Sequence, residues 1–170
     1  MKELSRFFII LITFTLAACG GGGGGGSTLP PVAKTAAVIK ISTNELPPAS
    51  GVKFTGVGVT LTLPKGVTVA TDISSVATAS GVAQGRSISG PVYTPAANPT
   101  IYLVVNALSN GDSAPFGIGE FVTVNLILPA GNSLTESDFT AEKIVSKWEP
   151  ANSDLAAVPG VLPRIDITLN

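Results

Sequence analysis

Apolar and polar residues alternate with a period of two in several segments from residue 36 onward, and this pattern constrains the fold more than any other feature of the chain. The segments are 37–42, 57–63, 101–106, 122–128 and 165–169. Successive side chains of a β-strand point to opposite faces, so each segment can bury one face and leave the other in water. Such one-sided strands are typical of antiparallel sheets rather than parallel ones.

Turn-forming clusters separate these segments. Proline fixes φ and glycine accepts a positive φ, so clusters of the two residues end strands. They lie at 47–51, 64–66, 109–112 and 129–132. Many short strands with frequent turns predict one all-β domain over residues 35–170, an antiparallel β-sandwich. Residues 80–100 alternate weakly, which predicts short edge strands and a loop, whereas 139–148 fits a helix or a strand equally well.

Two segments share the pattern V-x-V-x-L-x-L-P-x-G, at 57–66 and 122–131. Two core strands that end in similar proline–glycine turns explain this pattern better than an internal duplication does. The pattern therefore predicts that both strands are central in the fold, with their Val and Leu faces meeting in the core.

The first 18 residues have the pattern of a secretory signal. Lys2 and Arg6 precede an uncharged apolar run at 7–16, which leads into Leu16-Ala17-Ala18-Cys19. The run is too short to span a bilayer, which takes about 20 apolar residues. The last four residues resemble the lipobox of bacterial lipoproteins. That resemblance implies cleavage before Cys19 and lipid, palmitate included, on its thiol and amine. An ordinary signal peptide with an incidental cysteine is the alternative.

A tether is predicted at residues 19–34. The seven glycines at 20–26 have no side chains to pack and lose the most backbone entropy on ordering. A flexible segment of that length has a root-mean-square span of roughly 15 Å. In lipoproteins, an Asp directly after the lipidated cysteine usually retains the protein at the inner membrane. Gly20 stands there in this chain, so the resemblance implies an export address and favours the outer membrane.

The domain resembles cohesin domains, within the wider group of cohesin and carbohydrate-binding jelly-roll sandwiches. The likeness rests on 56–70, on 119–131 with the following Ser137-Asp138-Phe139, and on 164–169. It implies a jelly-roll-type sandwich that binds a dockerin-like or other envelope protein. Cohesins often carry Asp-Pro in the first turn, where this chain has Leu63-Pro64, and no contact residues can be matched to positions of this sequence.

Composition excludes several kinds of chemistry. The chain has no histidine and one cysteine, which the lipid would occupy, so triads and imidazole metal sites are ruled out. After loss of residues 1–18 the chain keeps 8 basic and 10 acidic side chains, which does not suit nucleic acid. The nearest carboxylate pairs are Asp112 with Glu120 and Glu136 with Asp138; we interpret them as solvated loop acids. Structural calcium held by these acids with Asn110 and Asn132 is possible, but no motif supports it. No other cofactor is expected.

Three function classes follow. The first is a non-enzymatic protein-interaction or structural module anchored to the envelope. The second is a carbohydrate-binding module, for which the candidate stacking residues are Tyr102, Trp148 and Tyr93. Tyr102 falls on the polar face of its strand and could be exposed, but we expect these rings to pack at a core or rim, as such rings more often do. The third is a carboxylate glycosidase, which needs two carboxyls flanking one cleft; the sequence gives no indication of one.

Overall fold

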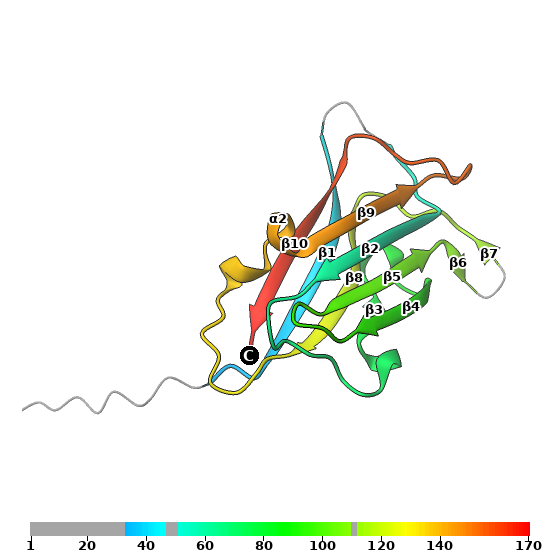
Figure 1. Cartoon of the computed structure of the whole chain (residues 1–170). Helices are drawn as coiled ribbons and strands as arrows, with labels where there is room; N and C mark the ends of the chain where they lie inside the picture. Colours follow the sequence, from blue (N-terminus) through cyan, green and yellow to red (C-terminus); the bar gives the residue numbers. More distant parts are fainter. Residues whose placement is uncertain (1–32, 47–50, 110–111) are drawn as a thin grey trace, which may run out of the picture. The chain divides into compact units, whose positions relative to one another are not determined.

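A computed structural model describes residues 33–46, 51–109 and 112–170 (Figure 1). They belong to one compact unit, Ala33–Asn170. The predicted signal peptide, Cys19, Gly20 and nearly all of the predicted tether lie outside the described residues.

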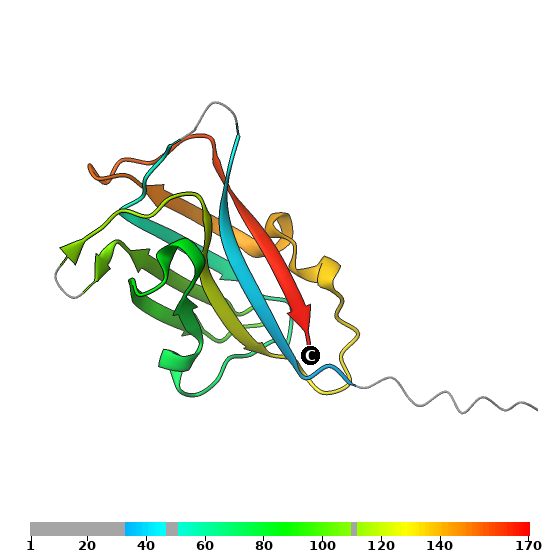
Figure 2. The same cartoon turned by 180° about the vertical axis from the view of Figure 1, so that it is seen from behind.

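The unit is an all-β sandwich of two antiparallel four-stranded sheets (Figures 1 and 2). The β1 sheet has the order β10-β1-β8-β3, and the β2 sheet has the order β4-β5-β2-β9. The strands of the two sheets are β1 (Ala36–Glu45), β2 (Gly56–Thr62), β3 (Ala77–Ala79), β4 (Ser87–Thr94), β5 (Thr100–Asn106), β8 (Gly119–Ile127), β9 (Val145–Ala151) and β10 (Val161–Leu169). Strands β6 (Leu108–Ser109) and β7 (Asp112–Ser113) form a separate small hairpin.

All five alternating segments are strands, as predicted, and their apolar faces meet between the sheets. The fully buried side chains of the four central strands are Ala37, Ile39, Ile41, Val57, Val59, Leu61, Ile101, Leu103, Val105, Phe121, Val122 and Val124. Phe121 breaks the alternation because β1 pairs Ile41 with Val122 but Ser42 with Glu120. This β-bulge leaves one extra residue on β8, so Phe121 and Val122 can both face the core.

The prediction drawn from the repeated pattern is confirmed. Strand β2 lies between β5 and β9, and β8 lies between β1 and β3, so the two strands are central in opposite sheets. Their proline–glycine turns meet at one end of the sandwich: a Cβ added at Gly66 would lie 3.3 Å from Cγ of Pro129. Thr68, just beyond the first turn, pairs with Ile127 at the end of β8.

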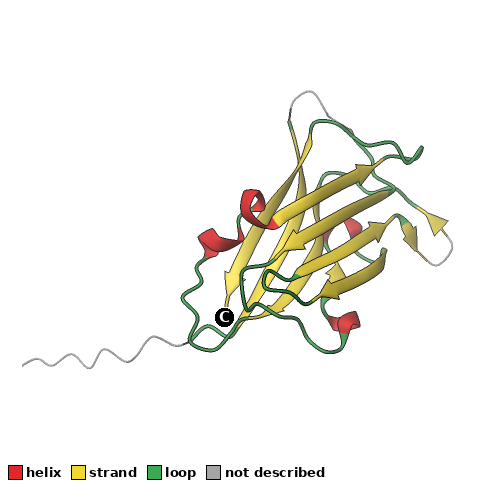
Figure 3. Cartoon of the chain, in the orientation of Figure 1, coloured by secondary structure: helices red, strands yellow, loops and turns green. Residues whose placement is uncertain are grey.

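The two ambiguous segments contain more regular structure than the sequence indicates. Within 80–100, one eight-residue edge strand, β4, follows a 3-10 turn at Gly81–Ala83. Within 139–148, the chain forms both structures in turn: the short helix α2 (Ala141–Ile144) leads directly into β9 (Figure 3). The 3-10 turn η3 (Glu136–Phe139) precedes α2, and Phe139 and Ile144 are buried in the core.

Proline marks the edges of both sheets. The three long edge strands each contain one proline: Pro91 in β4, Pro150 in β9 and Pro163 in β10. The central strands β1, β2, β5 and β8 contain none. Proline cannot donate to a neighbouring strand, so this placement opposes edge-to-edge pairing between sheets.

Candidate functional site

The outer face of the β2 sheet presents two rows of side chains that cross all four strands. The register aligns Val92, Tyr102, Thr60 and Lys147 in one row, from β4 to β9. The next row consists of Ser89, Val104, Gly58 and Glu149. We call these eight residues the Tyr102 face.

Apolar surface is concentrated at the β4–β5 side of the Tyr102 face. Val92 is 56% exposed and the adjacent Tyr102 is 40% exposed. Gly58 has no side chain, so the surface between Val104 and Glu149 is not raised at this position. A Cβ there would lie 3.4 Å from Glu149 and 3.8 Å from Cγ2 of Val104. The result is a shallow platform with one aromatic ring.

Charge is confined to the β9 side of the same face. Nζ of Lys147 lies 2.9 Å from Oε1 of Glu149, and both side chains are about half exposed. The hydrogen bond from Lys147 to the Glu149 carboxylate raises the pKa of Lys147 above its ordinary value. The platform is therefore rimmed on one side by an ion pair that is intact at neutral pH.

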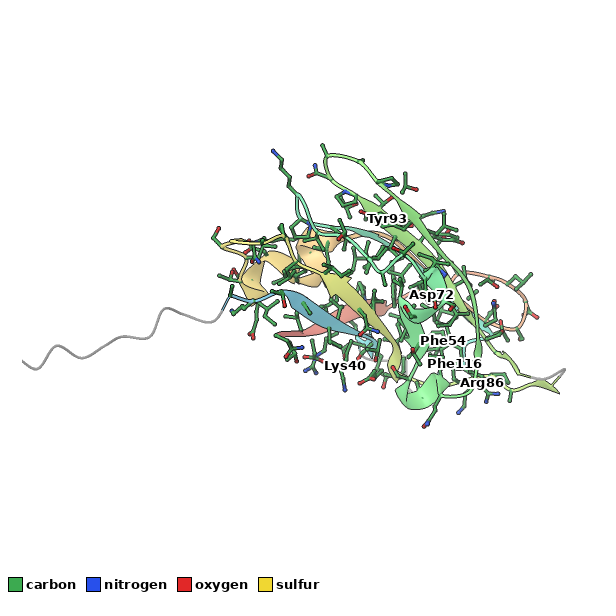
Figure 4. All side chains as sticks on the ribbon, turned by 90° about the horizontal axis from the view of Figure 1, so that it is seen from below. Lys40, Phe54, Asp72, Arg86, Tyr93 and Phe116 are labelled. Atoms are coloured by element: carbon green, nitrogen blue, oxygen red, sulfur yellow. The ribbon has the colours of Figure 1, made fainter. Side chains whose placement is uncertain are left out.

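The outer face of the β1 sheet has a different chemistry. It carries two ion pairs, Lys40 with Glu120 at 3.3 Å and Arg164 with Asp166 at 2.9 Å. Thr123 and Asn125 add polar side chains on β8, on the other side of β1 from β10, and Lys40 projects from this face (Figure 4). Exposed Leu162 and Ile127 also lie on this face, but they pair with Asn44 and Ala36 at opposite ends of β1, so they form no continuous apolar patch.

The three candidate stacking residues do not come together. Tyr93 pairs with Ile101 and packs against the core, with its hydroxyl 3.5 Å from the carbonyl oxygen of Val67 (Figure 4). Trp148 pairs with Val59 on the inward face of β9, and its indole N–H donates to the carbonyl oxygen of Val161 at 2.9 Å. Its ring lies 5.8 Å from that of Phe121. Both rings lie on the inward side of their sheet, so Tyr102 alone of the three lies on an outer face.

One acid of each predicted carboxylate pair, Asp138 and Glu120, already has a partner. Asp138 accepts from the backbone N–H and the hydroxyl of Thr135, which lowers the pKa of its carboxyl, and Lys143 lies 3.6 Å away. Glu120 is paired with Lys40. The side-chain amide of Asn132 donates to the carbonyl oxygens of Lys34 and Pro129. The side chain of Asp112, like Asn110, lies outside the described part of the structure.

The described part of the chain contains no group of three His, Cys, Asp or Glu side chains placed to hold a metal ion. Calcium binding thus stays a prediction from composition. Within the same residues, no helix is both long and apolar enough to cross a membrane.

Sequence reasoning missed Val92, which adds a second exposed large apolar side chain beside Tyr102. Its segment alternates too weakly to reveal its exposed side, and only the pairing of Val92 with Tyr102 across β4 and β5 brings the two together.

No family model matches the chain, no curated protein is similar to it, and no solved structure matches it. The assignment of a β-sandwich thus rests on strand order and register alone. Membership of the cohesin or jelly-roll group stays a prediction.

Proposed function

We propose that the chain is a lipoprotein anchored through Cys19 and that its β-sandwich is a non-enzymatic module that binds another envelope protein. The observation that carries the binding role is the difference between the two outer faces. The outer face of the β1 sheet exposes its large apolar residues Leu162 and Ile127 singly, at opposite ends of the sheet, whereas the Tyr102 face exposes Val92 and Tyr102 side by side next to a charged rim.

This arrangement agrees with the general anatomy of protein interfaces. Tyrosine is enriched at the centre of interfaces, and a polar rim surrounds the apolar centre. A tyrosine side chain buries a large area at a small entropic cost, because it has only two rotatable bonds. The prolines of the three long edge strands oppose binding through most of the sheet edges, which favours the face.

Affinity capture with paired variants tests the proposed binding surface. The full chain, Tyr102→Ala and the control Thr123→Ala, on the opposite outer face, are each used to capture proteins from envelope extracts. We expect one protein to bind the wild type and the control but not Tyr102→Ala. Equal binding to all three chains would place the interface elsewhere.

Binding of a polysaccharide is the second candidate, and one observation favours it. Tyr102 is an exposed ring with Thr60 directly beside it and Lys147 one strand further, so a sugar could stack on the ring and use these groups for its hydroxyls. A glycan array separates the two functions. Retention of glycans that Tyr102→Ala loses, with no captured protein, would favour the polysaccharide.

The anchor is tested independently of the ligand. Cys19→Ser should abolish incorporation of labelled palmitate and move the protein out of the membrane fraction. A Cys19→Ser chain that is still labelled, or still sediments with the outer membrane, would contradict lipidation at this residue.

A further inference from the structure

The free edge of β10 is open over only part of its length. Asn170 and Ala36 exchange two backbone hydrogen bonds, and the N–H of Leu46 donates to Gly160 at the other end of the ladder. Even-numbered residues of β10 therefore bond to β1, and odd-numbered residues direct their N–H and C=O groups to the free edge.

The first half of this edge is closed. The indole N–H of Trp148 donates a hydrogen bond to the carbonyl oxygen of Val161, and Pro163 has no backbone N–H. Further along, Ile165 and Ile167 direct backbone groups outward, and among the described residues no hydrogen bond reaches those groups from the free side.

A groove of about 480 Å³ runs along this open stretch. Arg164, Ile165, Asp166 and Ile167 form one wall, and the η3–α2 segment (136–142) forms the other. The volume lies within the range typical of ligand sites, roughly 300–1,000 Å³. An extended segment placed here could pair with Ile165 and Ile167 as an added strand.

The charges of the groove favour a basic ligand. Its lining contains three carboxylates, those of Glu136, Glu142 and Asp166, and one cation, Arg164, which is already paired with Asp166. Glu136 and Glu142 make no ion pair among the residues that the structure describes. A segment with basic side chains would supply the missing charge.

A second copy of this chain fits the groove poorly. A copy that paired through its β10 edge would bring the Glu136 and Glu142 of its own η3–α2 segment, which lies beside that edge, toward the same two carboxylates of this chain. We propose that the open edge of β10 at Ile165 and Ile167 binds a short extended segment of another protein, in which apolar residues alternate with Lys or Arg. This site is separate from the Tyr102 face.

The test uses a fluorescently labelled Val-Lys-Val-Lys-Val-Lys peptide, its Val-Glu counterpart, and the full chain purified in detergent. We expect the basic peptide to bind and the acidic one not to bind. Ile167→Pro removes the edge-facing N–H, and the matched Ile167→Ala removes the side chain but keeps that N–H. Loss of one hydrogen bond should weaken binding about fivefold more in the proline variant than in the alanine variant.

Two further measurements keep the inference falsifiable if Ile167→Pro does not fold. Glu136→Gln combined with Glu142→Gln should weaken binding of the basic peptide and reduce its salt dependence. Amide exchange at Ile165 and Ile167 should slow on peptide addition.

Absence of binding by the basic peptide, equal binding of the acidic peptide, or unchanged exchange at both amides would each overturn the inference. Loss of peptide binding in Tyr102→Ala would also overturn it, because the peptide would then lie on the Tyr102 face. Failure of the β10 site leaves the Tyr102 face untouched, since its own capture experiment does not involve β10.

Discussion

Replacing Gly81 by alanine should destabilise the sandwich far more than replacing Gly131. Both glycines have a positive φ, +52° and +66°, so alanine meets similar backbone strain at the two positions, about 1–2 kcal/mol. Alanine also restricts the unfolded chain, so its smaller loss of entropy on folding offsets about 0.4–1 kcal/mol of this strain at either site. The remaining difference comes from the surroundings of the new methyl group.

At Gly81 a Cβ would lie 2.3 Å from the carbonyl oxygen of Glu120, whereas nothing lies within 4 Å at Gly131. The first contact is with backbone of the central strand β8, which cannot rotate away, so the 3-10 turn at Gly81–Ala83 must move. Overpacking of this kind costs typically 1–3 kcal/mol. We expect Gly81→Ala to lose about 2–4 kcal/mol of unfolding free energy and Gly131→Ala about 1 kcal/mol or less.

Urea denaturation followed by fluorescence measures both values. Trp148 is the only tryptophan in the chain and is half-buried against Phe121, so its emission reports unfolding of the core. The slope of free energy against urea should be the same for both variants, with only the midpoint displaced. Equal midpoints for the two alanine variants would refute the close approach of Gly81 to β8.

Three further predictions test other contacts of the fold. Trp148→Phe should cost about 1–3 kcal/mol, because the buried carbonyl of Val161 loses its partner; circular dichroism would detect the change without tryptophan. Thr43→Val should cost a similar amount, since the buried Thr43 hydroxyl bonds both the N–H and the C=O of Gly119, while Thr43→Ser should keep most of the stability in thermal melts. The pKa of Asp138 is lowered by its hydrogen bonds from Thr135, so its stabilising effect is complete above the ordinary aspartate pKa and disappears as the pH falls below it. Asp138→Asn should therefore change stability at pH 7 but not near pH 2; an equal change at both would show that the charge is irrelevant.

Sequence alone predicts the strands that have one buried face and one solvent-exposed face. Alternation is strong in β1, β2, β5 and β8 because their apolar faces pack across the sandwich. It is weak in β4, where a change of register between Ser89 and Val92 interrupts the pattern. The segment that forms α2 and β9 is ambiguous in sequence because a short helix and a strand adjoin within ten residues.

The candidate site was only partly predictable for a similar reason. The exposure of Tyr102 follows from its place in an alternating strand, between the inward Ile101 and Leu103. The inward positions of Tyr93 and Trp148 follow instead from strand pairing, with Ile101 and Val59 respectively. Contact across strands is a property of register, which local patterns do not encode.

The prolines of β4, β9 and β10 acquire another meaning if the sandwich is held on a membrane as we propose. Copies anchored in one membrane diffuse in two dimensions and meet more often than the same number of molecules free in solution. An unblocked edge strand of one copy would then pair with the edge strand of the next copy, and the sheets would assemble into a continuous ribbon. The prolines in the three long edge strands, together with the carboxylates of Glu136 and Glu142 beside the open stretch of β10, would let the protein be crowded at a surface and still remain a set of separate, individually available receptors.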